Sequence, residues 1–237
     1  MLDTFHRYAQ PYIEFQKLSK GLSDGNSLRI LDVGANGIGV GRYLSEENVD
    51  LTLFDIKEFD SELKSGNTNI NFVVGIESEG LPFEDGFFDL VVSIDVLEHV
   101  PKSARKSFMN ELVRVSKNKV VVVFPEGKST IKAEKVMSYI YLRRNVFLSE
   151  HEQLGLPEIK DIELYFGDNQ KIKNLTVKSS LNLFLWFPIK IFSTILTRIS
   201  GGKWDLFIFQ LYRKLIFPVL NFGPTYGKCT VVEVGQK

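Results

Sequence analysis

The chain has 237 residues, of which 44% are hydrophobic and 24% charged, and its 29 basic and 29 acidic residues leave no net charge at pH 7. This is the composition of a globular domain, and it lacks the basic excess of a nucleic-acid-binding protein, so we expect no nucleic-acid partner. The single cysteine, Cys229, excludes a disulfide within the chain and a metal site built from cysteines. The first residues contain no basic stretch followed by an apolar core, which predicts a cytoplasmic protein.

The chain begins with an aromatic-rich segment, followed by a strand that runs into closely spaced glycines. Residues 3–20 carry apolar side chains at roughly helical spacing, with Pro11 among them, and predict one or two helices. Residues 28–33 predict a buried strand, and residues 40–47 predict the helix after it. The loop between them has glycines at 34, 37 and 39, where a ligand can approach bare backbone. No register of this loop supplies the G-x-G-x-x-G pattern of a dinucleotide site.

Strands and helices continue to alternate after the glycine loop. Residues 51–55 and 71–74 predict the second and third strands, and a fourth lies within residues 81–101. An amphipathic helix at 103–116 and a β-branched strand at 119–124 follow. This alternation predicts a doubly wound α/β sheet, which binds ligands at the carboxyl ends of its strands.

The last part of the chain predicts a helix at 131–144, a loop at 147–157, a helix at 158–166, and strands at 171–177 and 228–234. Residues 181–226 form an aromatic-rich insertion with both tryptophans, Trp186 and Trp204, and predict two helices separated by Gly201 and Gly202. Its uncharged runs are shorter than the roughly 18 residues that a membrane span needs. Three readings stay open: a helical pair packed on the domain, a lid over an acceptor pocket, or a surface that meets lipid or a second copy of the chain.

The glycine loop, the acid that ends the second strand, and the motifs L-P-F-x-D-G-x-F-D-L-V and D-V-L-E-H-V follow one another over residues 28–125. In this order and spacing they resemble the S-adenosylmethionine (SAM)-dependent methyltransferases with a Rossmann-like fold. The resemblance implies one domain over 1–237, with leading helices at 1–27 and a cofactor-binding core at 28–125. It also implies a mostly parallel seven-stranded sheet with helices on both faces, an antiparallel pair formed by its last two strands, and a helical insertion before the last strand.

The resemblance further implies a site for SAM, with S-adenosylhomocysteine as its product. The glycines would admit the cofactor, Asp32 would help to position its methionine part, and Asp55 can accept both hydroxyls of its ribose. Glu77 stands where the family usually has an aspartate for the adenine amine, with Ile76 in that place if the alignment shifts by one residue. The complete predicted cofactor-binding set is Asp32, Gly34, Asn36, Gly37, Gly39, Asp55, Ile56, Glu77 and Ile94.

Methyl transfer to oxygen also needs a group that removes the acceptor's proton, and histidine is the usual base at neutral pH. His99 and His151 are the candidates, because they follow the fourth and fifth strands; a purely structural role is the alternative for His99. Convergence of Glu98 with both histidines and a further carboxylate would make a metal site. No compact ligand motif is present, so we expect no metal.

We therefore predict a SAM-dependent methyltransferase that acts, at oxygen, on a small-molecule, sugar or lipid-linked acceptor. Peripheral membrane contact through residues 181–226, or a homodimer interface there, accompanies this prediction. The alternative is a SAM-binding regulatory or inactive module, which Asn36 and Glu77 would favour because both depart from the family pattern. An aminopropyl transferase is a third reading, but no acidic cluster follows the fourth strand beyond Asp95 and Glu98.

Overall fold

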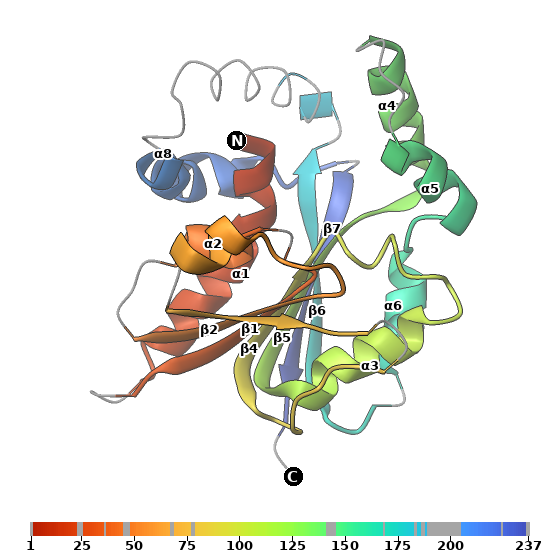
Figure 1. The fold of residues 1–237 in the computed structure, drawn as a ribbon. Coiled ribbons are helices and arrows are strands. Elements are labelled where there is room, and N and C mark those ends of the chain that lie inside the picture. The colour runs from red at the N-terminus through yellow and green to blue at the C-terminus, as the bar shows by residue number, and fades with distance from the viewer. Residues whose placement is uncertain are drawn as a thin grey trace.

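The computed structural model describes residues 2–22, 26–35, 37–44, 48–66, 69–76, 79–140, 146–167, 169–182, 184–185, 188, 205–223 and 225–235. These residues form one sheet flanked by helices (Figure 1). The strands are β1 Leu28–Val33, β2 Val49–Asp55, β3 Ile70–Val74, β4 Phe88–Ile94, β5 Ser116–Pro125, β6 Ile172–Asn182 and β7 Thr225–Val234. The α-helices are α1 Leu2–Ser19, α2 Ser61–Gly66, α3 Arg105–Val115, α4 Gly127–Ile140, α5 Val146–Leu154, α6 Ile159–Phe166 and α8 Asp205–Leu211.

The seven strands lie in the order β3-β2-β1-β4-β5-β7-β6. The first five run parallel, whereas β7 runs antiparallel to both β5 and β6. The sheet is therefore mixed, and the expected antiparallel pairing of the last two strands is confirmed. The chain reverses its direction of growth between β1 and β4, so the carboxyl ends of these two strands flank the crevice in which such sheets bind ligands.

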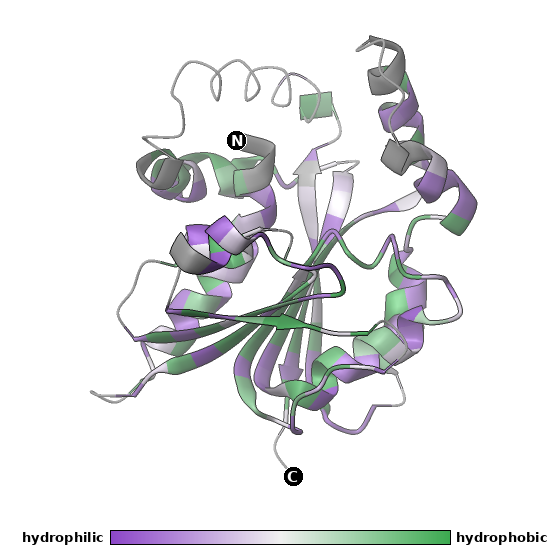
Figure 2. Cartoon of the chain, in the orientation of Figure 1, coloured by the Kyte–Doolittle hydropathy of each residue, from purple (hydrophilic) through white to green (hydrophobic). Residues whose placement is uncertain are grey.

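Two apolar clusters cover the two faces of the sheet. Helices α1 and α8 contribute Phe5, Phe15 and Phe209 to one cluster, and α3 and α6 contribute Met109 and Ile162 to the other. Figure 2 shows the hydrophobic positions concentrated in the central strands. In β5 every residue from Val120 to Phe124 is buried, because the strand is covered on both faces. Each such side chain contributes about 1.5–3 kcal/mol when it leaves water.

The leading segment is one continuous helix rather than two. Pro11 lies inside α1, where it removes one backbone hydrogen bond. The apolar face nevertheless continues through it, since Phe5, Ala9, Tyr12 and Phe15 are all buried against the sheet. Packing of this face against the core outweighs the local cost of the proline.

Two local predictions were wrong. The helix predicted at 40–47 is, within the described residues, only a short 3₁₀ helix, η1, at Gly39–Arg42. Glycines are poor helix formers, and Gly41 packs so closely on β2 that an added Cβ would lie 2.9 Å from Leu51. The loop predicted at 147–157 contains helix α5. Among its described side chains the buried one is His151, which a search for apolar side chains at helical spacing does not count.

The insertion is also shorter than predicted, because β6 extends to Asn182. Its described part before β7 is helical: α8 continues into a π-helix at Tyr212–Ile216 and a 3₁₀ helix at Phe217–Val219. The two tryptophans and the predicted Gly201-Gly202 break lie outside the described residues. No helix in the described ranges has both the length and the apolar character to cross a bilayer.

Candidate functional site

The glycine loop leaves β1 at the carboxyl edge of the sheet, and its three glycines at 34, 37 and 39 are required for two different reasons. A Cβ at Gly34 would lie 2.2 Å from Val96 Cγ2, and one at Gly39 would lie 2.1 Å from Asp32 Oδ2. These two positions are therefore fixed by packing inside the protein. Gly37 has a φ of +80°, yet a Cβ there would meet no atom within 4 Å. It borders open space, where an external group can approach the backbone; Asn36 lies outside the described residues.

Asp32 forms a hydrogen bond with the end of the glycine loop. Its buried Oδ2 accepts a hydrogen bond of 2.8 Å from the backbone N–H of Val40, just past the last glycine. Burial raises the pKa of Asp32 to about 7, and this hydrogen bond opposes the rise. The carboxyl group thus ties the far end of the loop to β1, and its predicted contact with a cofactor stays a prediction.

Side chains suited to a nucleoside follow the next two strands. Asp55 ends β2, half-buried, with its Oδ1 accepting from Lys57 N at 3.0 Å. Ile56 and Ile76 expose 49% and 58% of their surface just after β2 and β3. The exposed apolar side chains offer a surface on which a nucleobase can pack, and the nearby carboxylate can accept hydrogen bonds from ribose hydroxyls. Glu77 lies outside the described residues.

Helix α1 closes over this edge. Arg7 pairs with Asp95, the first residue after β4, which has a φ of +54° that few non-glycine residues adopt. Tyr8 lies near the carboxylates of Asp32 and Asp95. Burial raises the pKa of its hydroxyl, and these two carboxylates add to the rise. Ile94, predicted to contact a cofactor, is buried in the core at the end of β4. The leading helix therefore builds one wall of the candidate site.

The two candidate histidines, which are distant in sequence, meet at this edge. His99 lies in the turn after β4 and His151 on α5, with ring centroids 5.6 Å apart. His151 Nδ1 lies 2.8 Å from Glu134 Oε2 on α4, and Tyr226 on β7 donates its hydroxyl to Glu134 Oε1 at 2.7 Å. Each ring thus has a carboxylate partner, because His99 Nδ1 lies 3.1 Å from Glu150 Oε2.

Glu98 lies beside these histidines and is 2% exposed. Burial, together with the neighbouring charge of Asp95, raises the pKa of Glu98 well above its usual value. The third histidine of the chain, His6, lies elsewhere: its buried Nδ1 is 2.6 Å from the hydroxyl of Tyr212. We assign His6 to the packing between α1 and the helices before β7.

Sequence reasoning missed the carboxylates that orient the histidines. Glu134 and Glu150 belong to helices that follow β5, and nothing in their local sequence separates them from solvated acids. Arg7 was missed for the same reason. The usable signal for the two glutamates was their position in the chain. Both α4 and α5 follow β5, and segments that follow the strands of such a sheet lie at its carboxyl edge.

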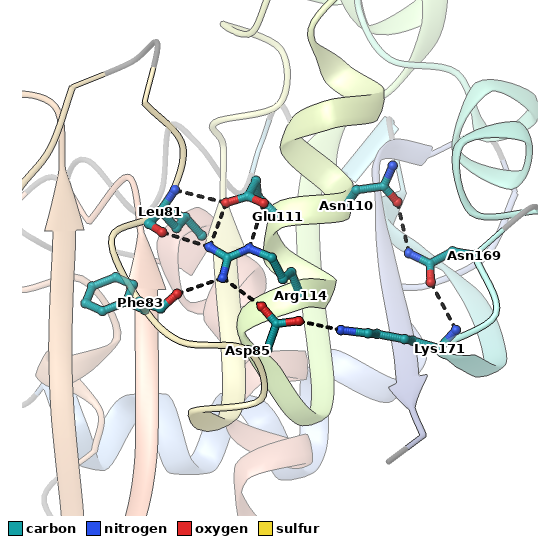
Figure 3. A network of polar contacts seen from close by, with 8 residues as sticks. All are labelled: Leu81, Phe83, Asp85, Asn110, Glu111, Arg114, Asn169 and Lys171. Atoms are coloured by element: carbon teal, nitrogen blue, oxygen red, sulfur yellow. Dashed lines mark hydrogen bonds and ion pairs between the residues drawn. The ribbon is translucent and has the colours of Figure 1, made fainter. Parts of the chain in front are cut away.

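The most specific sequence motif of the chain has a structural role that Figure 3 makes visible. Arg114 on α3 donates to the carbonyls of Leu81 and Phe83 at 2.8 and 2.7 Å, and to Asp85 Oδ1 at 3.0 Å. Glu111 orients the same guanidinium and accepts from Leu81 N at 3.1 Å. The L-P-F-x-D segment is therefore anchored to α3 through the backbone of Leu81 and Phe83 and the carboxylate of Asp85, which explains a fixed turn before β4.

Comparison with known proteins gives a family match for the core of the sheet. Residues 31–124 match the family model described as a methyltransferase domain. An uncharacterized protein from Methanocaldococcus jannaschii is 30% identical over 159 residues, a match that spans 65% of this chain and 65% of that relative. The resemblance noted in the sequence motifs is confirmed over the matched core.

Solved structures share the fold across nearly the whole chain. Magnesium protoporphyrin IX methyltransferase from Synechocystis, with bound S-adenosylhomocysteine, has a TM-score of 0.56 at 12% identity and covers 98% of this chain and 84% of its own. Phosphoethanolamine N-methyltransferase 2 from Haemonchus contortus, in complex with phosphomonomethylethanolamine and S-adenosylhomocysteine, has a TM-score of 0.56 at 17% identity and covers 94% and 52%. At these identities the likeness shows a common fold.

Proposed function

We infer, from the premise that residues 31–124 form a methyltransferase domain, that this chain is a SAM-dependent methyltransferase. The observation that carries the proposal is the carboxyl edge of the sheet. There an open glycine turn, a strand-ending carboxylate and two carboxylate-paired histidines belong to one site region. This combination supplies both a place for a nucleoside cofactor and groups that can handle a proton.

The edge fits SAM in three respects. Gly37 leaves the space that a side chain would fill, so a bulky ligand can lie against the loop. Ile56 and Ile76 present exposed apolar surface for an adenine ring. Asp55 ends β2, directly before Ile56, and can accept two hydrogen bonds from ribose hydroxyls. Contacts from Asn36 and Glu77 remain part of the proposal.

When bound, SAM supplies a methyl group that is already activated on a positively charged sulfur. The chain's own task is to align an acceptor and to take up its proton. His151 suits this role, because Glu134 on Nδ1 fixes the ring and stabilises the imidazolium that forms when Nε2 takes a proton. His99, with Glu150 on its Nδ1, is the second candidate base.

We propose a hydroxyl of a small-molecule, sugar or lipid-linked acceptor as the methylated group. Histidines with carboxylate partners support an acceptor that must lose a proton, as a hydroxyl does. Among proteins of this fold, one is a carbon methyltransferase and another an N-methyltransferase, so this part of the proposal depends on the histidines alone. Mass spectrometry of an acceptor panel, reading the gain of one methyl group, tests it directly.

An exposed apolar surface in the segment before β7 supports contact with a membrane. The segment before β7 exposes the apolar side chains of Leu211, Leu215, Ile216, Val219 and Phe222. Two basic residues follow Leu211 in the chain: Lys214 is exposed, and Arg213 is half-buried with its guanidinium over the ring of Tyr12. Exposed apolar side chains interleaved with basic ones suit the surface of an anionic bilayer. We propose this surface as a peripheral membrane contact, with a homodimer interface as the alternative that the test below separates.

Calorimetric titration with SAM, S-adenosylhomocysteine and NAD tests the cofactor. We expect the first two to bind and NAD not to bind. Asp55→Asn should weaken S-adenosylhomocysteine binding at least tenfold, since hydrogen bonds to charged groups contribute about 1.5–3 kcal/mol each. Asp50→Asn, at the exposed start of the same strand, is the matched control and should bind as the wild type does. Binding without turnover by any acceptor would favour a regulatory module, and no binding would refute the proposal.

A further inference from the structure

Three metal-ligating side chains converge between the turn after β4 and helix α5. Glu98, His99 and His151 each offer one ligand atom, and these atoms all lie within 4.8 Å of one another. Two ligands come from adjacent positions in the turn and the third from a helix that follows β5. Because no short sequence motif joins them, the cluster exists only in the folded protein.

Two of the ligand groups each contain a buried atom without a hydrogen-bond partner in the described part of the chain. Glu98 Oε2 and His151 Nε2 have no hydrogen-bond partner among the described residues, and the two residues are 2% and 5% exposed. A buried polar atom left unpaired costs about 1–3 kcal/mol, so native proteins rarely keep one without a reason. Two such atoms on neighbouring side chains indicate that a further group binds between them.

Each of the two histidines has a carboxylate beside its Nδ1, as histidines that bind metal ions commonly do. Glu134 occupies Nδ1 of His151 at 2.8 Å and leaves Nε2 as the ligand atom. Glu134 is itself held by the hydroxyl of Tyr226 at 2.7 Å. Glu150 Oε2 lies 3.1 Å from Nδ1 of His99. A carboxylate on the far nitrogen fixes the tautomer and orientation of a histidine that binds a metal.

We propose that Glu98, His99 and His151 bind a divalent metal ion of the zinc class. Two imidazoles and one carboxylate suit zinc or cobalt, whereas calcium and magnesium prefer oxygen ligands throughout. Ligand atoms about 2.1 Å from a tetrahedral zinc ion are roughly 3.4 Å apart, so binding would draw the three groups closer together.

Three protein ligands leave a fourth position for water or another oxygen. If the proposed function is right, this position faces the acceptor, because the cluster belongs to the same carboxyl edge as the glycine loop. An acceptor hydroxyl there would bind the ion and lose its proton more readily than in water. The histidines would then act as ligands of the ion, and the ion would replace them as the group that activates the hydroxyl.

Titration of zinc into chelator-treated, full-length protein tests the site without any cofactor. We expect one ion per chain, with binding at least tenfold weaker in Glu98→Gln, His99→Gln and His151→Gln. Glu134→Gln should lose about tenfold through the orientation of His151. Glu152→Gln is the matched control, because it lies next to His151 on α5 but pairs with Lys135; it should bind as the wild type does.

Cobalt gives a second, spectroscopic readout. The wild type should show visible absorption of a tetrahedral cobalt site, and the three ligand variants should lose it. His99→Gln keeps the test decisive if the buried variants fail to fold, because the His99 side chain is 31% exposed. Absence of zinc binding in the wild type, or equal binding by wild type, control and ligand variants, would overturn the proposal. Since no cofactor is present in these titrations, this outcome is separate from failure of the methyltransferase assignment.

Discussion

Gly37→Ala separates the folding role of the glycine loop from its role in binding. The residue has a φ of +80° and no atom within 4 Å of an added Cβ, so alanine meets strain but no clash. A left-handed conformation costs an alanine about 1–2 kcal/mol. We therefore expect the free energy of unfolding to fall by about that amount while the protein stays folded. The new methyl group occupies the space against which the cofactor should lie, so affinity for S-adenosylhomocysteine should fall at least tenfold, or about 1.4 kcal/mol.

The chain supplies a control with the same local cost. Gly86, in the turn before β4, has a φ of +63° and likewise no atom within 4 Å of an added Cβ. Gly86→Ala should lose similar stability in urea unfolding but keep the wild-type affinity in calorimetry. If Gly37→Ala bound S-adenosylhomocysteine as tightly as Gly86→Ala does, the open space at the loop would not be the cofactor site, and the reasoning would be refuted.

Three further predictions concern stability and surface contact. Arg114→Met should lower the free energy of unfolding by about 2 kcal/mol, because two partly buried backbone carbonyls lose a charged donor; wild-type stability in urea would contradict this. Burial lowers the pKa of His6 to about 3. On acidification the unfolded chain therefore takes up a proton on this histidine at a higher pH than the folded protein does, and this destabilises the fold. From pH 7.5 to 5 this contribution should reach about 2 kcal/mol, and the stability difference between wild type and His6→Gln should shrink by that amount. The paired change Leu215→Gln and Val219→Gln should reduce co-sedimentation with anionic vesicles, whereas Leu164→Gln, an equally exposed apolar position on α6, should not. A lower sedimentation coefficient with unchanged vesicle binding would instead identify a dimer interface.

Local sequence determined most of the sheet. The Val120–Phe124 run predicts a strand covered on both faces, and the alternation of strands and helices before it predicts a doubly wound, mostly parallel sheet. The glycine loop and Asp55 were readable because the residue types themselves carry the constraint: bare backbone in one case and a strand-ending carboxylate in the other.

The failures of sequence reading came where tertiary contacts outweigh local preference. Pro11 suggests a break, but the buried face of α1 continues through it. Residues 147–157 look like a loop, because the inward-facing position of α5 is His151, a polar residue whose burial depends on Glu134. Periodicity arguments count apolar side chains, so a buried polar pair is invisible to them.

The candidate histidines could be named from the sequence, but their meeting could not be foreseen. His99 and His151 were singled out by residue type and by the strands that they follow. Only the parallel order of β4 and β5, and the docking of α4 and α5 at their ends, brings the two rings within 5.6 Å and supplies each with a carboxylate. Residue chemistry is local and is written in the sequence. The distance between two side chains depends on how the whole sheet and its helices pack, and this is why the tertiary structure alone decided that Glu98, His99 and His151 form one cluster.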